Sequence, residues 1–529
     1  MEREGFLNQM RESQDNWDFI IIGGGATGLG IAIDAANRGY KTVLLEQSDF
    51  AKATSGRSTK LVHGGVRYLQ KGDVGLVVEA LRERGYLRKN APHLVKSQRF
   101  IIANYLWWEK PFYSLGLTMY DLLSGTMSLG RSKPVSRKEV IKRIPQIEKK
   151  NLKGGVQYYD GQFDDARLAV NMMQTAIDNG AAVVNYAMVT DLIKNREGRI
   201  SGVKVRDEIE GSEFVLRGHC VINATGIFVD SVIRLDNPDE HPLVRPSQGV
   251  HLVVDKSFLG GDDAIMVPKT SDGRVMFGVP WHDRVILGTT DIPVNEFVLE
   301  PRALKEEVDF ILETAGRYLE KKPERKDVLC VFAGLRPLAA PRKNANGAKT
   351  KEISRRHKLI VSPSGLVTIT GGKWTTYRQM AKETLDIAIR SGKMEFLPCK
   401  TAHLKIHGYV RNPDRTKWMH IYGSDQAEII KLQEENPAFA EKLDERYDFT
   451  VAEVVWAVRK EMARTIDDVL ARRIRILFLD AGASIEMAPK VASVMAAELK
   501  RNSDWEQQQV KEFIEIAGSY VLQEIPGIG

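Results

Sequence analysis

A short apolar run that ends in three glycines, DFIIIGGGATG, restricts the fold of this 529-residue chain more than any other segment. Residues 18–22 have the composition of a buried parallel strand. Residues 29–38 predict a helix that Gly39 ends, and residues 42–45 predict a second buried strand. A strand, a glycine-rich turn, a helix and a second strand in this order begin a nucleotide-binding α/β fold.

The glycines of the turn are Gly23, Gly25 and Gly28, with the spacing G-x-G-x-x-G. They permit a tight turn, bring the backbone close to a pyrophosphate and let the helix pack closely on the strand. The helix N-terminus adds N–H groups and the positive end of its dipole. Glu46, at the end of the second strand, is placed to accept hydrogen bonds from adenosine ribose hydroxyls. The alternative is a glycine turn without a ligand, and the strand, helix and acidic residue in register argue against it.

The remaining residues predict three regions. A helix is expected over 165–179, strand patterns with Gly/Asp turns run from 248 to 291, and 400–525 is helical and charged. We therefore predict an α/β protein with a discontinuous Rossmann-like dinucleotide-binding domain, an antiparallel-sheet substrate or cap domain, and a helical C-terminal domain. The predicted boundaries are 17–95, 155–245 and 328–392 for the first domain, 96–154 and 246–327 for the second, and 393–529 for the third.

Composition limits the class of protein. Apolar residues make up 43% and charged residues 27%, as in globular proteins, and the net charge of +7 indicates an anionic ligand or surface. No dense basic run with interleaved aromatics is present, so we predict no nucleic-acid partner. The three cysteines are far apart and indicate no metal site and no disulfide framework. Because no signal peptide and no run of about 18 apolar residues is visible, we expect a cytoplasmic protein.

Two later segments favour FAD over a nicotinamide dinucleotide. A mostly apolar strand runs into Ala224, Thr225 and Gly226, which resembles the ATG element of flavoproteins with two dinucleotide folds, the glutathione reductase and D-amino-acid oxidase type. A turn at Gly371 and Gly372, followed by a helix that starts near Thr375, resembles their C-terminal flavin contact. A helix N-terminus there faces the pyrimidine end of the isoalloxazine, where reduction places negative charge.

The segment TSGRSTKLVHGGVRYL, residues 54–69, combines hydroxyls, glycines, one histidine and three cations. Small hydroxyl residues and glycines can lie close to a pyrophosphate and an isoalloxazine, whereas the alternative is an irregular polar loop. We expect Arg67 and Tyr68 to emerge beside the flavin ring, where a substrate lies. The residues expected to contact FAD here are Thr54, Ser58, Thr59, Lys60 and His63.

Six motifs in order, TKLVHGGVRYL, FDDARL, INATG, GTTDIP, FAGLRPL and TGGKWTTYR, resemble the FAD-dependent glycerol-3-phosphate dehydrogenases. They extend over about residues 18–378, and the segment EMARTIDDVLARR resembles the terminal domain of the same family. The resemblance implies oxidation of sn-glycerol 3-phosphate to dihydroxyacetone phosphate, with the C2 hydride going to flavin N5 and the electrons to a membrane quinone. It also implies a peripheral position on the inner face of the cytoplasmic membrane, and it allows a homodimer.

The substrate residues carried over from the family are Arg336 in GLRPL, Arg355 in ISRR and Lys373 in TGGK. A phosphate dianion requires several convergent donors, and arginine forks suit it well. Each of the three is otherwise a surface charge, an alternative that weighs most for Arg355 because Arg356 and His357 follow it.

Loss of hydride from C2 requires removal of the hydroxyl proton by a base. His251, in SQGVHLVVD, is the candidate because its alternating strand is expected to face the flavin, and the alternative is a hydrogen-bonded strand histidine. Arg67 and Tyr68 are expected to orient the C2 oxygen.

Several alternatives remain open from the sequence. One is a glycerophosphate oxidase that uses oxygen, one is an amine or amino-acid oxidase on the same fold, and one is a flavoprotein that only binds. The aromatic stretch around Trp107 and Trp108, with Lys110, Arg131 and Lys133 nearby, is either a membrane-surface segment or a buried part of the cap. No segment matches a calcium loop of the D-x-[DN]-x-[DN]-G type.

Overall fold

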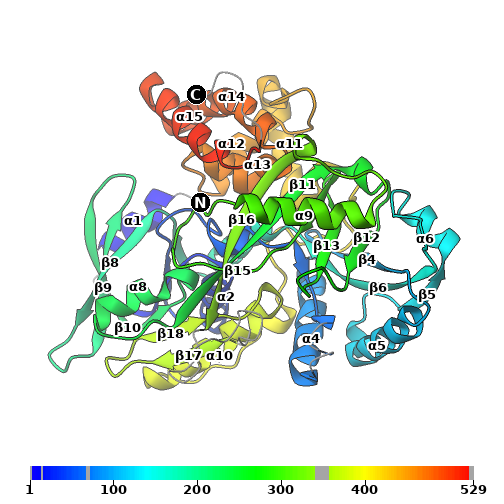
Figure 1. The fold of residues 1–529 in the computed structure, drawn as a ribbon. Coiled ribbons are helices and arrows are strands. Elements are labelled where there is room, and N and C mark those ends of the chain that lie inside the picture. Colours follow the sequence, from blue (N-terminus) through cyan, green and yellow to red (C-terminus); the bar gives the residue numbers. More distant parts are fainter. Residues whose placement is uncertain (1–2, 13–15, 67–68, 70–71, 340–356, 523–529) are drawn as a thin grey trace.

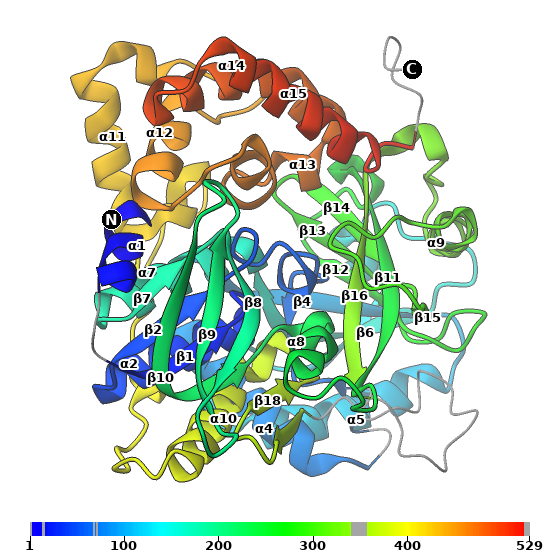
Figure 2. The same cartoon turned by 90° about the vertical axis from the view of Figure 1, so that its left-hand side faces the viewer.

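The computed structural model describes residues 3–12, 16–66, 69, 72–339 and 357–522 (Figure 1). Over these residues the chain forms two β-sheets, with helices packed around them and a group of C-terminal helices above both (Figure 2). The predicted class, an α/β fold with a separate antiparallel sheet and a helical C-terminal region, is confirmed.

The first sheet contains the predicted strand–turn–helix–strand unit. Its central strand β1 (Trp17–Ile22) is parallel to its neighbours β2 (Thr42–Leu45) and β10 (Glu213–Asn223). Alternate residues of β1 enter different cores: Phe19 and Ile21 pack with helices, while Ile20 and Ile22 pack on the side of the hairpin formed by β8 (Ala187–Lys194) and β9 (Ile200–Asp207). This double burial explains the continuous apolar run. The strand order is β17 (Lys358–Val361), β18 (Val367–Thr370), β10 (Glu213–Asn223), β1 (Trp17–Ile22), β2 (Thr42–Leu45) and β7 (Ala182–Val184), and β8 (Ala187–Lys194) and β9 (Ile200–Asp207) extend β10.

Three helices cover one face of this sheet: α2 (Ala26–Arg38), α7 (Asp165–Asp178) and α10 (Tyr377–Ser391). Helix α2 begins three residues before the predicted start, because Gly25 is its N-cap and Gly28 lies inside its first turn. Gly39 ends it with a φ of 101°, as predicted. On the other face lie α1 (Arg3–Glu12) and α8 (Val229–Asp236).

The second sheet is largely antiparallel, with β12 and β4 as a parallel pair. Its order is β15 (Ile292–Pro293), β11 (Val244–Asp255), β14 (Arg284–Gly288), β13 (Met276–Trp281), β12 (Ala264–Val267), β4 (Val95–Asn104), β6 (Gly154–Phe163) and β3 (Leu61–Val62), with β16 (Val328–Ala339) on β11 and β5 (Lys133–Ser136) on β6. Four helices flank it: α4 (Val74–Asn90), α5 (Glu109–Ser124), α6 (Arg137–Arg143) and α9 (Lys305–Tyr318).

Besides the short β3, which pairs with β6, two longer strands lie on the other side of the predicted domain boundaries. β6 was assigned with the dinucleotide-binding domain, yet it pairs with β4 along ten residues. β16 was assigned there too, yet it pairs with β11, with Gly334 opposite Gly249 and Phe332 opposite His251. The GLRPL segment therefore belongs to the second sheet, and this pairing places Arg336 beside the strand that carries His251.

The C-terminal region is helical, as predicted. Its helices share an apolar core that includes Cys330 and Phe332 of β16, so this region packs directly on the second sheet. Figure 2 shows it across the top of both sheets. The helices are α11 (Gln426–Glu435), α12 (Val451–Lys460), α13 (Ile476–Leu479), α14 (Ala481–Leu499) and α15 (Ser503–Gly518).

Candidate functional site

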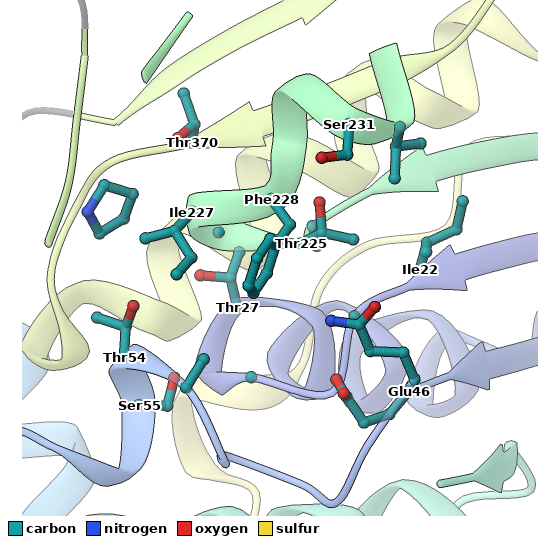
Figure 3. A pocket seen from close by; sticks show the side chains of 18 of the residues that line it. Ile22, Thr27, Glu46, Thr54, Ser55, Thr225, Ile227, Phe228, Ser231 and Thr370 are labelled. Carbon is teal, nitrogen blue, oxygen red and sulfur yellow. The ribbon is translucent and has the colours of Figure 1, made fainter. Parts of the chain in front are cut away.

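A cavity of about 800 Å³ opens at the C-terminal ends of β1 and β2. Side chains from distant parts of the chain surround it, as Figure 3 shows for Thr54 and Ser55 at the left, Glu46 at the right, and Thr27 and Thr225 between them. Cavities at the carboxyl ends of parallel strands are where nucleotides bind in this class of sheet.

The glycine turn lies against the ATG element at the cavity wall. Gly23 has a φ of 110°, and a Cβ atom there would lie 2.7 Å from the carbonyl oxygen of Ala224. A Cβ atom on Gly28 would lie 1.9 Å from the carbonyl oxygen of Gly23. A residue with a side chain at either position would therefore clash with the backbone. With glycines there, the N-terminus of α2 stays open to the cavity and can bind a pyrophosphate.

Glu46 lies half-buried at the end of β2 and lines the same cavity. Its carboxylate accepts hydrogen bonds from the backbone N–H groups of Gly24, at 2.6 Å, and Ser48, at 2.9 Å. Burial raises the pKa of Glu46. A carboxylate has about four acceptor sites, so these two bonds fix its position and leave capacity for ribose hydroxyls.

The ATG and TGGK elements meet on the opposite side of the cavity. Thr225 and Gly226 line it next to Gly371, Gly372 and Lys373. Gly371 and Gly372 have φ values of 78° and 81°, and a Cβ atom on Gly372 would lie 2.3 Å from the sulfur of Met380. This wall is made of backbone, as an extended planar ligand requires. Together with the turn and Glu46, the residues present fit a dinucleotide of the FAD type.

A second cavity, of about 340 Å³, shares part of its wall with the first. Both cavities are lined by Thr54, Pro337 and residues 371–374. The other walls of the second cavity come from β11, β16 and the GTTD segment, and they carry His251, Arg336 and Asp291. A ligand in the second cavity is therefore adjacent to the end of the first that TGGK closes.

His251 lies on β11 and is only 2% exposed. Its Nε2 atom is 2.8 Å from the hydroxyl of Thr59, and its ring stacks on Phe332 with centroids 4.8 Å apart. Burial, together with the charges of Arg336 and Lys60, lowers the pKa of His251 well below its ordinary value. The imidazole is therefore neutral at pH 7 and has a lone pair for a proton.

The side chain of Arg336 packs on the backbone of Gly249. A Cβ atom on Gly249 would lie 2.1 Å from Nη2 of Arg336. Nη1 donates to the carbonyl of Gln248 at 3.2 Å, and Nη2 donates to the hydroxyl of Thr289 and the carbonyl of Thr290, each at 3.1 Å. Its side chain is 23% exposed and lies 3.4 Å from the carboxylate of Asp291. The guanidinium is thus fixed in orientation at the cavity wall, and an arginine held in this way suits an anionic group of a substrate.

Comparison with known proteins now identifies the family. Residues 18–378 match the model of the FAD dependent oxidoreductases, and residues 366–510 match that of the C-terminal domain of alpha-glycerophosphate oxidase. Rat mitochondrial glycerol-3-phosphate dehydrogenase is 38% identical over 99% of this chain and 75% of its own length. The chain belongs to the FAD-dependent glycerol-3-phosphate dehydrogenases. The prediction of FAD as the cofactor is confirmed.

Further relatives agree with this dehydrogenase family. A mitochondrial glycerol-3-phosphate dehydrogenase of Arabidopsis thaliana is 38% identical over 95% of this chain and 86% of its own length. The crystal structure of a glycerol-3-phosphate dehydrogenase from Bacillus halodurans complexed with FAD superposes with a TM-score of 0.80 at 28% identity, covering 100% of this chain and 98% of the other. An L-alpha-glycerophosphate oxidase from Mycoplasma pneumoniae, at 17% identity and a TM-score of 0.56 over 73% of this chain and 97% of its own, shares the fold.

The predicted site residues of the dehydrogenase separate into groups. Arg67, Tyr68 and Arg355 lie outside the described residues. Ser58, Thr59, His63 and Thr375, which were expected at the cofactor, line the second cavity and not the first. Thr375 is buried, and its hydroxyl accepts a hydrogen bond from the backbone N–H of His63 at 3.1 Å. Those that line the first cavity are Gly23, Gly25, Glu46, Thr54, Ala224, Thr225, Gly226, Gly371, Gly372 and Lys373.

Lys60 departs from the prediction that it contacts the cofactor. It lines neither cavity and is fully buried, and its ammonium lies 2.7 Å from the carboxylate of Asp165 and 2.8 Å from the carbonyl of Gly56. Burial lowers the pKa of Lys60 to about 8. The charge of Lys60 compensates that of Asp165, which is also fully buried and requires a cation beside it.

Sequence reasoning did not assign several residues of the second cavity. Arg57 lines it and forms an ion pair with Glu300 at 2.5 Å, and Arg274 lines it from the turn before β13. Thr289 and Thr290 supply two of the contacts of Arg336. The signal for the threonines was present, since GTTDIP was one of the six family motifs. Among the described residues, no group of three or more His, Cys, Asp or Glu side chains could hold a metal ion.

Proposed function

We propose that this dehydrogenase oxidises sn-glycerol 3-phosphate at C2 to dihydroxyacetone phosphate and passes the electrons to a membrane quinone. Bound FAD supplies the oxidant, because its N5 atom accepts a hydride. The observation that carries the proposal is the shared wall at residues 371–374, which joins the dinucleotide cavity to a pocket with fixed cations and a neutral histidine. A small phosphoester in that pocket lies next to the TGGK end of the first cavity.

The substrate phosphate is assigned to the cationic side of the second cavity. Arg336 presents a guanidinium oriented by four oxygen atoms, and Lys373 lies on the wall between the two cavities. A phosphate dianion in a partly buried pocket requires more than one cation, and arginine binds it with two parallel hydrogen bonds. Arg355 is proposed as a third contact from its place in the family motif.

The proton of the C2 hydroxyl is assigned to His251. This imidazole is neutral before the substrate binds, because burial and the charges of Arg336 and Lys60 disfavour its protonation. A phosphate dianion bound at Arg336 offsets part of that positive field, so the imidazole becomes a better base once the substrate is present. Arg67 and Tyr68 are proposed to orient the C2 oxygen, again from the family motif.

The test is an anaerobic half-reaction. Glycerol 3-phosphate added to the FAD-loaded protein without oxygen is expected to bleach the visible flavin band, whereas glycerol, glycine and L-proline are not. Arg336→Gln is expected to weaken substrate binding by about 10- to 100-fold, because loss of a charged hydrogen bond costs about 1.5 to 3 kcal/mol. Bleaching by an amino acid, or none with glycerol 3-phosphate, contradicts the proposal. Reoxidation by a soluble quinone analogue, set against peroxide formation in air, separates dehydrogenase from oxidase.

An exposed apolar stripe on α5 supports the membrane part of the proposal. Its members recur every three or four residues, so they share one face of the helix. Leu115 and Leu122 are 71% and 75% exposed, which is unusual for leucine on a helix that packs its other face on β6. The stripe consists of Trp108, Phe112, Leu115, Met119 and Leu122, and Trp107 at 83% exposure precedes it.

Basic residues lie beside the stripe. Arg131 and Lys133 are exposed at the start of β5, which packs against α5. An apolar helix face with basic neighbours is suited to the interface of a membrane that contains anionic lipids. Within the described part of the chain, no helix is long and apolar enough to cross a bilayer. We therefore propose that α5 lies in the plane of the membrane surface.

Flotation with liposomes tests this membrane contact. Wild type is expected to float with vesicles that contain anionic phosphatidylglycerol, and Leu115→Ser/Leu122→Ser is expected to remain at the bottom, since each substitution removes about 2 kcal/mol of apolar transfer. Val215→Ser/Val361→Ser, at exposed apolar positions on β10 and β17, is the matched control. Equal flotation of the two double variants contradicts the assignment. If wild type is a dimer and only Leu115→Ser/Leu122→Ser is a monomer, the stripe contacts a second copy of the chain and not a membrane.

A further inference from the structure

We propose that Thr59 is a catalytic residue whose hydroxyl relays the proton of the substrate C2 hydroxyl to Nε2 of His251. The inference rests on the proposed function and goes beyond it. Thr59 was expected to contact FAD, whereas its hydroxyl lies 2.8 Å from Nε2 of His251 and lines the second cavity. Both residues line this cavity, but His251 is 2% exposed and Thr59 is half-buried, so Thr59 presents more of its surface to a ligand there.

One face and two edges of the His251 ring are closed to a substrate. One face stacks on Phe332 at an interplanar angle of 16°. The Cδ2 edge packs on Gly288, where an added Cβ atom would lie only 2.5 Å from Cδ2. The Nδ1 atom is buried and has no hydrogen-bond partner within the described residues. Nε2 is therefore the nitrogen in position to exchange a proton with a ligand, and the Thr59 hydroxyl already bonds to it.

Thr59 is held in place by the residues on either side of it. The backbone N–H and the hydroxyl of Ser58 donate to Asp165 at 3.0 and 2.7 Å, and the ammonium of Lys60 lies 2.7 Å from the same carboxylate. Asp165 is in turn 2.8 Å from the guanidinium of Arg475, a fully buried residue of the C-terminal region. A hydroxyl between two anchored neighbours keeps one position, as transfer of a proton along a short hydrogen bond requires.

The step balances without another reactant. The C2 hydroxyl proton passes to the Thr59 oxygen while the Thr59 proton passes to Nε2, so Thr59 is unchanged and His251 gains one proton. The C2–H electron pair leaves as hydride to the oxidant that the proposed function names, and C2–O becomes a carbonyl. The relay requires the His251 tautomer with hydrogen on Nδ1. Burial and the charges of Arg336 and Lys60 lower the pKa of His251, so the ring is neutral as the relay requires. The ¹⁵N-histidine spectra described below determine which nitrogen carries the hydrogen.

The test compares Thr59→Val, which keeps the shape and removes the hydroxyl, with Thr59→Ser, which keeps the hydroxyl. Flavin reduction by glycerol 3-phosphate is measured in a single anaerobic turnover and expressed per bound flavin. Thr59→Val is expected to be about 10²- to 10⁴-fold slower, the range for loss of general-base catalysis, with substrate affinity within about threefold. Thr59→Ser is expected to restore the rate to within about tenfold of wild type.

Two further measurements separate a relay from a structural role. The double variant Thr59→Val/His251→Asn is expected to be no slower than His251→Asn alone, because two groups in series lose their function together. In ¹⁵N-histidine spectra of the resting protein, the His251 signal, assigned by its absence in His251→Asn, is expected to show hydrogen on Nδ1 in wild type. A population with hydrogen on Nε2 is expected to grow in Thr59→Val, where the hydroxyl that favours one tautomer is absent.

The outcomes are distinct. Near-wild-type reduction by Thr59→Val overturns the relay, as do equal rates for Thr59→Val and Thr59→Ser or multiplying losses in the double variant. All of these results assume that glycerol 3-phosphate reduces the wild-type flavin. If it does not, the proposed function fails as a whole, and the wild-type control alone shows this.

Discussion

Gly28 is the residue at which the sequence motif and the packing agree most directly. A methyl group there would lie 1.9 Å from the backbone carbonyl oxygen of Gly23. The clash is with backbone, so no side chain can move aside to relieve it. We expect Gly28→Ala to lose most of its bound FAD and to lower the free energy of unfolding by about 2 kcal/mol or more, since the turn must open. Flavin absorbance per protein and the thermal midpoint measure both effects.

Gly75 provides the control for this substitution. It lies in α4 and has nothing within 4 Å of the position where its Cβ atom would be. Gly75→Ala is expected to leave FAD content unchanged and to stabilise the protein slightly, by no more than about 1 kcal/mol, because alanine favours helix. FAD retained by Gly28→Ala at the level of Gly75→Ala would mean that the turn adapts and that the close approach is not needed.

Residues could be predicted from the sequence where their role is local. The glycine spacing and Glu46 lie within 24 residues of each other, and a strand–turn–helix–strand unit brings them together by itself. The protein partners of Thr59 and Lys60 could not be predicted, because they are His251 and Asp165, which are 192 and 105 residues away. Polarity and spacing indicated a loop near a ligand, but the partner of each hydroxyl or ammonium is decided by strand pairing elsewhere in the chain.

At the scale of elements, His407 ties the segment before α11 to the end of α7. One ring nitrogen is 2.6 Å from the carboxylate of Asp178 and the other is 3.0 Å from that of Asp425. Burial alone would lower the pKa of His407, but the two carboxylates outweigh it and raise this pKa to about 9. The protonated imidazole therefore joins the dinucleotide-binding domain to the C-terminal region at neutral pH.

This contact predicts an alkaline loss of stability. Because the folded-state pKa lies above the ordinary value of 6.5, the stabilisation is fully present below about pH 6.5 and disappears as the pH rises through about 9. His407→Gln is expected to cost about 1 to 2 kcal/mol near pH 7, allowing for partial solvent screening, and almost nothing near pH 10. Thermal midpoints of wild type and variant across this range measure the difference.

His219→Gln, on an exposed position of β10, controls for the loss of a histidine. A gap that stays constant with pH contradicts the charged bridge.

Elements were predicted well where the pattern is short and buried, and less well where sheets had to be told apart. Residues 18–22 and 42–45 were found as strands because two short apolar runs, separated by a glycine-rich turn and a helix, are distinctive. β6 and β16 were not predicted as strands, and their residues were assigned to the dinucleotide-binding domain. Each alternates or runs apolar in the same way as its neighbours, and only hydrogen bonding to β4 and β11 shows which sheet it joins.

At the scale of the whole molecule, the C-terminal region is fixed to the cofactor domain by buried charges. Asp49, in the loop after β2, lies against the guanidinium groups of Arg472 and Arg473, and all three are at most 3% exposed. Arg167 of α7 pairs in the same way with Glu461, at 2.8 Å for one of its two bonds. The segment EMARTIDDVLARR supplies most of these cations, so the motif that resembled the family's terminal domain is the motif that binds the two parts together. Its role between the two parts was not visible in the sequence, because the partners outside the segment, Asp49 and Arg167, are 423 and 294 residues away from Arg472 and Glu461.

We expect the loss of the buried carboxylate of Asp49 to lower the stability of the protein more than the loss of an ion pair at the surface. Burial alone would raise the pKa of Asp49, but Arg473 and Arg472 outweigh it and hold this pKa below its ordinary value of 3.8. Its contribution is therefore present above about pH 4 and is lost only as the pH falls below that value. Asp49→Asn is expected to cost about 3 to 5 kcal/mol, because it removes the carboxylate that contacts the fully buried Arg473, whereas Arg472 keeps its pairs with Asp467 and Asp468. Glu320→Gln, at a half-exposed pair with Lys149, is expected to cost less than about 1 kcal/mol.

Thermal midpoints of Asp49→Asn and Glu320→Gln, taken at one heating rate, are compared at pH 7 and at pH 5. The gap between the two variants is expected to be the same at both pH values. Equal midpoints for the two variants would mean that the buried pairs contribute no more than surface ones, and that apolar contacts with β16 hold the C-terminal region in place.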